Sequence, residues 1–189
     1  MNRIVEYDIA AFSKINGQWH NGFLDWLMPL LRNQYTWAPL YLFTLVFMLL
    51  NFKWKGFGWI CFFLITFAIT DMVSGSMLKP FVGRLRPCAD PMLASVIRSV
   101  VNCGGPLSFP SSHAANHFGL AMFGFKTLSF IPYSWRWLLF LWALSISYAQ
   151  VYVGVHFPVD TICGMLLGYI VGSGTGWAFN KKAGFASLA

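Results

Sequence analysis

Long apolar stretches, broken by short polar clusters, dominate this chain. Four of them carry almost no charge and are long enough for one helical crossing of a hydrocarbon layer about 30 Å thick, which needs roughly 20 residues. They are residues 33–52, 56–77 with Asp71 inside, 137–159 and 161–180. A fifth stretch, 112–131, contains Lys126 near its end, where a lysine can extend to the interface. The pattern predicts an all-α integral membrane protein with a bundle of five to six transmembrane helices.

The first 32 residues have a different pattern. Charged residues punctuate short apolar runs there, namely Glu6, Asp8, Lys14, Asp25 and Arg32. This pattern predicts amphipathic helices that lie in the membrane interface. A sixth span built from this segment would have to hold Asp25, and we expect no cleavable signal peptide because a continuous apolar core is missing. We therefore expect a single domain over residues 1–189, with an interfacial segment at 1–32 and a helical core at 33–180.

Composition supports a membrane location. Only 10% of the residues are charged and 57% are hydrophobic, so a soluble domain of 189 residues would lack polar surface. A net charge of +7 would suggest nucleic-acid binding in a soluble domain, but the basic residues here are divided between two membrane faces. We expect no nucleic acid as partner and a membrane with anionic lipid head groups instead. The sequence leaves the oligomeric state open.

Three polar clusters interrupt the apolar pattern, at residues 79–87, 110–113 and 156–160. The first two follow the second predicted span and the third lies between the fourth and fifth, so all three should share one membrane face. Basic residues mark the opposite face: Lys53, Lys55, Lys126, Arg136, Lys181 and Lys182. The excess of basic residues on cytoplasmic loops then predicts a bacterial inner-membrane protein whose polar clusters face the periplasm or the outside.

The first two clusters contain groups that bind anions. Lys79 and Arg86 supply positive charge, and a guanidinium can hold two phosphate oxygens at once. Ser111 and Ser112 are good residues for the start of a helix, whose exposed amides attract anions. Taken singly, these residues also fit contacts to lipid phosphates and an ordinary helix cap. A histidine in the first turn of this helix, His113, is not explained by capping.

The third cluster contains a histidine and a carboxylate four residues apart. On a helix His156 and Asp160 would share one face, so that the carboxylate could accept a hydrogen bond from one ring nitrogen. The other nitrogen would then be a free nucleophile, and the carboxylate would stabilise the developing imidazolium. A structural hydrogen bond between the two is the simpler alternative.

The segments KPFVGRLRP at 79–87, PSSH at 110–113 and VYVGVHFPVD at 151–160 resemble the three signature motifs of the type 2 phosphatidic acid phosphatase superfamily. The resemblance implies a metal-independent lipid phosphatase without a cofactor. It implies that His156 is the nucleophile that forms a phosphohistidine, that Asp160 orients it and that His113 protonates the leaving oxygen. Lys79, Arg86 and the Ser111 region would hold the phosphoryl oxygens. Substrates of this class are lipid phosphates such as undecaprenyl diphosphate, phosphatidylglycerol phosphate, phosphatidic acid or a lipid A phosphate.

The chain departs from these motifs at two positions. Gln150 stands where the third motif normally has an arginine, so one charged phosphate ligand is replaced by an amide. Ser112 stands where the second motif usually has glycine. We expect Ser111, Ser112 and Gln150 to bind phosphate oxygens. We expect reduced or retuned activity. A catalytically silent lipid-phosphate binder or sensor, and a small transporter dependent on Asp71, are the alternatives.

Three further patterns carry separate expectations. The sequence leaves open whether Cys88 and Cys103, in the expected outer loop, form a disulfide. His113 and His117 have a spacing that could bind a metal on a helix, but the intervening glutamate of metalloproteases is missing, and we expect no metal site. Glycines recur every four residues in the last stretch, at positions 164, 168, 172 and 176, which predicts a close approach to a neighbouring helix.

Overall fold

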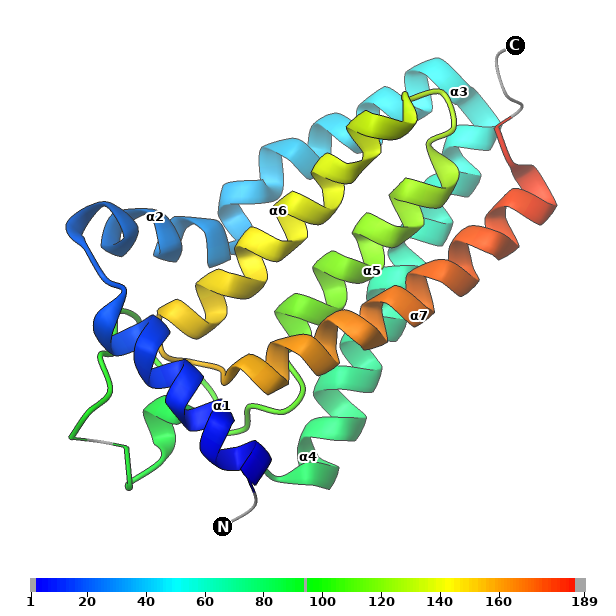
Figure 1. Ribbon diagram of the computed structural model, residues 1–189. Coiled ribbons are helices and arrows are strands. Elements are labelled where there is room, and N and C mark those ends of the chain that lie inside the picture. The colour runs from blue at the N-terminus through cyan, green and yellow to red at the C-terminus, as the bar shows by residue number, and fades with distance from the viewer. Residues whose placement is uncertain (1–2, 94, 186–189) are drawn as a thin grey trace.

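The computed structural model describes residues 3–93 and 95–185, and these form a bundle of helices (Figure 1). The N-terminal elements are α1 (Arg3–Ser13), a π-helical turn (Lys14–Gln18) and α2 (Gly22–Arg32). The middle of the chain forms α3 (Gln34–Asp71), a π-helical segment (Met72–Leu78), α4 (Lys79–Val82) and a short 3-10 turn (Pro87–Ala89). The last three helices are α5 (Ser112–Thr127), α6 (Tyr133–Tyr152) and α7 (Pro158–Ala183).

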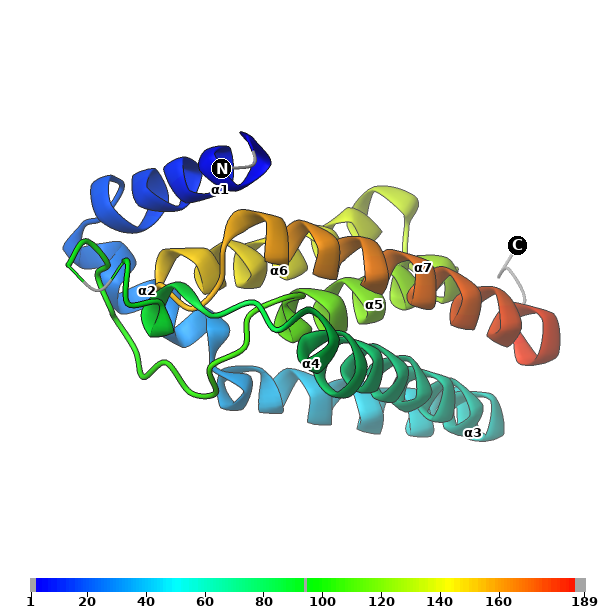
Figure 2. The ribbon, with the colours of Figure 1, turned by 90° about the horizontal axis from the view of Figure 1, so that it is seen from below.

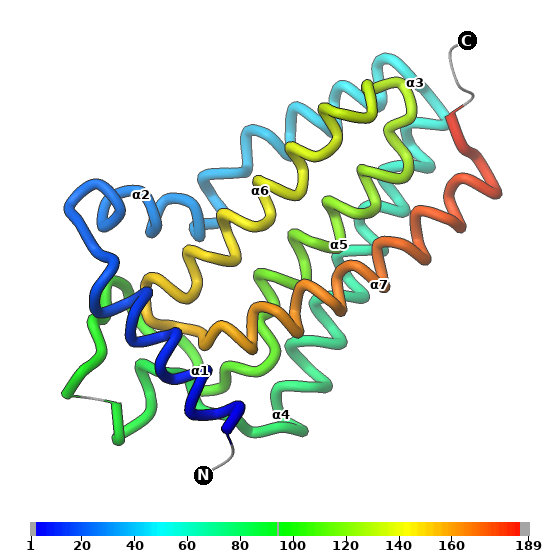
Figure 3. Tube along the Cα trace, viewed as in Figure 1, coloured from blue at the N-terminus to red at the C-terminus, as the bar shows by residue number. Residues whose placement is uncertain are grey.

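Helix α3 is a hairpin of two arms rather than one straight rod. The backbone leaves helical geometry at Lys53, where φ is 49° and ψ is −122°, and the chain reverses direction there (Figures 1 and 3). Gly56 is required beside this turn, because a Cβ atom there would collide with the backbone carbonyl of Met48. The rings of Tyr41 and Phe63 then face each other across the two arms, with centroids 6.4 Å apart. The predicted break between the first two apolar stretches is confirmed.

Within the part of the chain that the structure describes, two segments are long and apolar enough to cross a membrane: residues 34–82, which include both arms of α3, and α7. The count of five to six spans therefore stays a prediction. Helices α1 and α2 have 11 residues each and are only about 16 Å long at 1.5 Å per residue, too short to cross the hydrocarbon layer. Neither of these two helices is long enough by itself to be a sixth span.

Helix α5 occupies the centre of the bundle, between α6 and α7 (Figure 1). The four glycines of α7 face α5, and a Cβ atom at Gly168 would come within 2.6 Å of the backbone nitrogen of Gly119. The predicted close approach along this stripe is confirmed. Large rings fill the space toward α3, where Trp59, Phe123 and Phe179 are buried together with Met48.

Helices α1 and α2 pack against the end of the bundle that carries the polar clusters. Seen from below, α1 lies on one side of the layer formed by α5, α6 and α7, and α3 lies on the other (Figure 2). Phe12 of α1 packs on Phe157, at the start of α7, with ring centroids 5.4 Å apart. Met28 of α2 is buried against Ala149 and Tyr152 of α6. The N-terminal segment is thus part of the wall around the polar end.

The opposite end of the bundle gathers the turn of α3, the connection between α5 and α6, and the end of α7 (Figure 1). The ring of Phe52 lies 4.8 Å from that of Phe130 and 4.5 Å from that of Phe185. The connections that carry the basic residues therefore meet at this end, away from the three polar clusters. The direction of the bundle in the membrane stays a prediction.

Candidate active site

The loop after α4 is folded back against the chain that precedes α5. Gly83, with φ of 66°, ends α4 in a left-handed conformation that favours glycine. The backbone nitrogen of Arg86 then donates to the carbonyl of Pro106 at 2.8 Å. Cys88 and Cys103 form a disulfide with their Cα atoms 5.8 Å apart, which settles the alternative that the sequence left open. These contacts hold Arg86 beside the start of α5.

A cavity of about 550 Å³ lies between the two arms of α3 and α5. Its polar end is lined by Lys79, Arg86, Ser112 and His113, which are four of the predicted site residues. Asp71 and Asn116 also line it, and apolar side chains form the rest of its wall, among them Leu45, Phe63, Leu64, Phe67 and Leu120. The cavity therefore offers a cationic end for an anion and an apolar surface for a hydrocarbon chain.

Helix α5 begins at this polar end. Ser111 is its N-cap residue, as predicted, and its hydroxyl accepts a bond from the nitrogen of Ala114 at 3.4 Å. The Ser111 side chain is fully buried in that role, whereas Ser112 and His113 line the cavity. The nitrogen of Ser111 donates to the carbonyl of Asp160 at 2.9 Å, which ties the start of α5 to the start of α7.

The prediction that His156 and Asp160 share a helical face is wrong. Helix α7 starts only at Pro158, and His156 lies in the preceding turn, which Gly154 forms with φ of 89°. The Nδ1 atom of His156 lies 3.6 Å from Oδ2 of Asp160, which is longer than a hydrogen bond, and no described residue bonds it. That carboxylate oxygen instead accepts from the backbone nitrogen of Phe157 at 2.8 Å. Asp160 therefore caps α7 and lies beside the imidazole.

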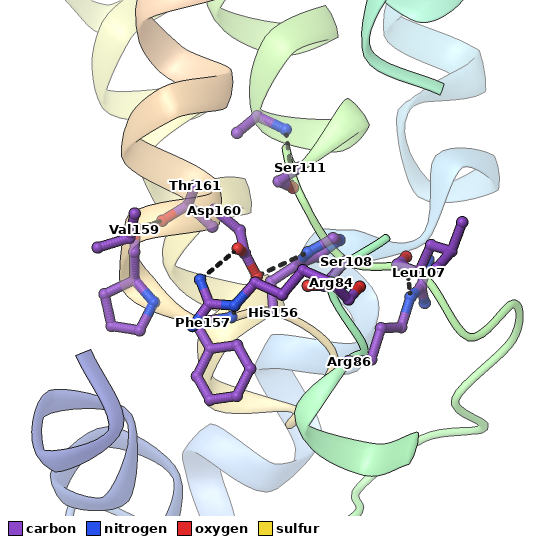
Figure 4. A network of polar contacts seen from close by, with 12 residues as sticks. Arg84, Arg86, Leu107, Ser108, Ser111, His156, Phe157, Val159, Asp160 and Thr161 are labelled. Carbon is purple, nitrogen blue, oxygen red and sulfur yellow. Dashed lines mark hydrogen bonds and ion pairs between the residues drawn. The ribbon is translucent and has the colours of Figure 1, made fainter. Parts of the chain in front are cut away.

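Arg84, which lies between Lys79 and Arg86 in the first cluster, joins two carboxylates at the site. Arg84 donates to Oδ1 of Asp160 at 2.8 Å and to Oδ2 of Asp8 at 2.6 Å. Its guanidinium also lies 4.0 Å from the centre of the Phe157 ring. Figure 4 shows Arg84 reaching Asp160 beside His156, while Arg86 points the other way, toward Leu107. Because both carboxylates are buried, Arg84 fixes the position of Asp160 and links it to α1.

His156 is fully buried, and its electrostatic surroundings favour a neutral ring. Burial lowers the pKa of His156 to about 4, the neighbouring Asp160 opposes this shift, and the positive charges of Arg86 and Lys79 add to it. The charges of His113 and His156 are also close enough to interact. A neutral imidazole beside two cations can donate an electron pair to a phosphorus atom whose oxygens those cations hold.

Gln150 lies directly behind this histidine. It is buried near the end of α6, and its backbone carbonyl accepts from the nitrogens of Val155 and His156 at 3.2 and 3.3 Å. No described residue bonds its side-chain amide. Arg86 is held differently, since its guanidinium donates to the carbonyls of Leu107 and Cys103. Burial lowers the pKa of Arg86, and the charge of Asp160 opposes that shift, so the two residues lie within electrostatic reach.

Several other polar residues near this end of the bundle bind partners of their own. Arg98 does not reach the site, because it pairs with Asp25 at 2.7 Å. Asp71 accepts a bond from the side-chain amide of Asn116 at 3.0 Å. The two ring nitrogens of His117 contact the carbonyl of His113 at 2.7 Å and the hydroxyl of Tyr41 at 3.2 Å, so this side chain supports the cavity wall. Among the described residues no group of three His, Cys, Asp or Glu gathers as a metal site.

Two residues of the site escaped sequence reasoning. Asp8 was assigned to an interfacial helix, yet its Oδ1 accepts from the nitrogen of Val159 at 2.9 Å and its Oδ2 binds Arg84. Asn116 joins Asp71 and Thr70 at the cavity wall. The positions of Asp8 and Asn116 in the sequence do not indicate that either residue makes these contacts.

Comparison with known proteins agrees with this geometry. The family model "PAP2 superfamily" matches residues 59–183. A lipid A 4'-phosphatase of Bacteroides thetaiotaomicron is 36% identical over 166 residues, which cover 85% of this chain and 70% of that protein. The crystal structure of Aquifex aeolicus LpxE matches with a TM-score of 0.65 and 27% identity, covering 88% of this chain and 93% of that one.

The fold is shared with a second solved structure. The transmembrane PAP2-type phosphatidylglycerolphosphate phosphatase of Bacillus subtilis matches with a TM-score of 0.71 and 24% identity, covering 96% of this chain and 88% of that one. The all-helical bundle is therefore the fold of PAP2 membrane phosphatases. Together with the family match over most of the core, this shows that the chain belongs to the PAP2 superfamily of metal-independent membrane lipid phosphatases.

Proposed function

We propose that this protein removes a phosphate group from a membrane lipid through a phosphohistidine intermediate. The observation that carries the proposal is the cavity that joins a cationic end, with Lys79 and Arg86, to an apolar wall. A lipid phosphate has the same division, with an anionic head and a hydrocarbon tail. A water-soluble phosphate would gain nothing from the apolar part.

In the proposed first step the free nitrogen of His156 attacks phosphorus, and the bond from phosphorus to the leaving oxygen breaks. Asp160 stabilises the positive charge that develops on the ring, and His113 gives its proton to the leaving oxygen. Lys79, Arg86 and the amides at the start of α5 stabilise the charge on the phosphoryl oxygens. In the second step water attacks the phosphohistidine, His113 accepts the proton of that water, and inorganic phosphate leaves.

Ser112 and Gln150 are proposed as neutral donors to the phosphoryl oxygens. Ser112 lines the cavity beside His113, and the Gln150 amide has no bond to a described residue. Ser111 is proposed to act through the helix cap that it forms, because its buried hydroxyl is engaged with Ala114. An amide at position 150 forms a weaker bond to an anion than a guanidinium would, since bonds to charged groups contribute about 1.5–3 kcal/mol.

A lipid A phosphate is the foremost candidate among the four substrate classes, because a relative named as a lipid A 4'-phosphatase aligns with 85% of this chain. Undecaprenyl diphosphate, phosphatidylglycerol phosphate and phosphatidic acid follow. Release of inorganic phosphate from a panel of these lipids, in the presence of a chelator, ranks them. Loss of release with the chelator would contradict a metal-independent reaction.

We further propose five membrane spans: the two arms of α3, α5, α6 and α7. Helices α1 and α2 would lie in the interface, and the whole chain would form one domain in a bacterial inner membrane with the cavity toward the periplasm. The supporting observation is that the connections carrying the basic residues meet at the end opposite the cavity. Labelling of single cysteines placed at positions 55 and 92 from the outside of intact cells tests the direction.

The phosphohistidine is tested by quenching the reaction with alkaline detergent, after incubation with a lipid labelled in its phosphate. We expect a label on the wild-type protein that is stable to base and lost in acid, and none on His156→Ala. His113→Ala should slow both formation and loss of the adduct, while thermal unfolding in detergent shows that both variants remain folded. Labelling of His156→Ala equal to the wild type would refute the mechanism.

The second candidate is a catalytically silent lipid-phosphate binder on the same fold. Gln150 favours it, because the usual charged ligand is absent there. A binder would retain the lipid phosphate without a covalent adduct and without phosphate release. The same quench experiment therefore separates the two candidates.

A further inference from the structure

A second cavity adjoins the first at its polar end. It has a volume of about 460 Å³, and Arg32, the last residue of α2, lines it together with Pro29 and Val101. His113 lines both cavities, as do Gln34 and Tyr35. The two cavities therefore meet at His113, and Arg32 lies close enough to this histidine for their charges to interact.

Arg32 has no partner among the residues that the structure describes. Its Nε atom is buried without a hydrogen bond, and no carboxylate there pairs with it. The guanidinium does not bond the last carbonyls of α2 either. The carbonyl of Leu30 accepts from the backbone nitrogen of Asn33, and that of Leu31 accepts from the ring nitrogen of Trp37. Of the other arginines near this end, Arg84 and Arg98 each bind a carboxylate, and Arg86 donates to two backbone carbonyls.

The charge of this guanidinium is uncompensated where it lies. Burial lowers the pKa of Arg32, and the positive charge of Arg86 lowers it further. A half-buried cation beside another cation is unfavourable, and an anion bound between them removes the repulsion and replaces the lost hydration. The planar guanidinium of an arginine can donate two hydrogen bonds at once to a phosphate or carboxylate group.

The side of the site on which Arg32 lies indicates which part of the substrate it meets. In the proposed function His113 protonates the leaving oxygen, so the leaving group begins beside His113, where the two cavities meet. We propose that Arg32 binds a second anionic group, a phosphate, that the leaving group itself carries. For one and the same lipid anchor, the protein then prefers the form with two neighbouring phosphates over the form with one. This inference rests on the proposed function for the assignment of the leaving side.

Binding of inorganic diphosphate and of inorganic phosphate to His156→Ala protein, by calorimetry in detergent, tests this preference without turnover. Adding Arg32→Gln should weaken diphosphate binding by about tenfold or more, the value of one charged hydrogen bond, and phosphate binding by much less. Arg32→Lys should restore part of the difference because the charge remains. The matched control is Lys14→Gln, which removes an exposed charge from the same N-terminal segment and should change neither affinity.

Hydrolysis gives an independent readout. With prenyl diphosphate and prenyl monophosphate of the same tail, the ratio of their kcat/KM values should fall at least about tenfold in Arg32→Gln and stay constant in Lys14→Gln. Equal losses for both probes, or no loss for either, would overturn the second-phosphate subsite. If the wild type hydrolyses neither lipid while Arg32 still selects diphosphate in the binding assay, the proposed function fails and the subsite stands.

Discussion

The ion pairs of Arg84 with Asp8 and Asp160 give the sharpest test of how the N-terminal helix contributes to the site. The side chains of Asp8 and Asp160 are 2% and 0% exposed, and that of Arg84 is 23% exposed. Removing one partner from a buried pair typically costs about 3–5 kcal/mol, because the other charge is left without compensation. We therefore expect Arg84→Gln to lower the free energy of unfolding by about this amount.

Asp8→Asn is the milder change. Its amide oxygen can still accept from the nitrogen of Val159, and Arg84 keeps Asp160 as partner, so a loss of about 1–3 kcal/mol is expected. The double variant should lose less than the sum of the two, since neighbours that share a network usually couple by about 0.5–3 kcal/mol. Chemical denaturation in a mild detergent, followed by tryptophan fluorescence, measures all three free energies.

The catalytic consequence follows from the position of Asp160. Without Arg84 the carboxylate loses one of the contacts that hold it beside His156, and a misplacement near 1 Å can cost about a hundredfold in rate. We expect kcat to fall by roughly 10–100-fold in Arg84→Gln, with KM changed little, when lipid phosphatase activity is assayed well below the unfolding temperature.

Arg98→Gln is the matched control, because Arg98 also pairs with an aspartate but the two side chains are 29% and 36% exposed. Water screens such a pair, so a much smaller loss of stability and no loss of kcat are expected. Additive effects of Asp8→Asn and Arg84→Gln, or an unchanged kcat in Arg84→Gln, would refute the argument that α1 positions the carboxylate.

Two further predictions concern packing and protonation. Gly168→Ala should lower the unfolding temperature in detergent, because its Cβ atom would meet the backbone of α5, whereas Gly174→Ala on the same helix has nothing within 4 Å and should not; equal effects would contradict the packing argument. In NMR spectra of the four labelled histidines, identified by His156→Gln, the His156 ring should titrate near pH 4, and titration near 6.5 would contradict its burial. Since the unfolded chain takes up that proton first, this residue's contribution to folding is complete above about pH 6.5 and is lost as the pH falls through about 4.

Local sequence determined most of the helices. The break near Lys53, the start of α5 at Ser112 and the glycine stripe of α7 could all be predicted, because each depends on residues within a few positions of one another. Chain order also placed the three polar clusters at one end, since two helices joined by a short loop must return to the same side. The motifs then indicated a family, which the comparisons bear out.

Only the tertiary structure decided how the charges are distributed among partners. The sequence contains several arginines near the site, and spacing cannot tell that Arg84 binds Asp8 and Asp160 or that Arg98 binds Asp25. Nor can it tell that Arg32 has no carboxylate partner among the described residues. These pairings join positions 76 residues apart in the case of Arg84. Coulomb energy depends on distance in space and on local burial, and both are set by how the helices pack rather than by their order in the chain.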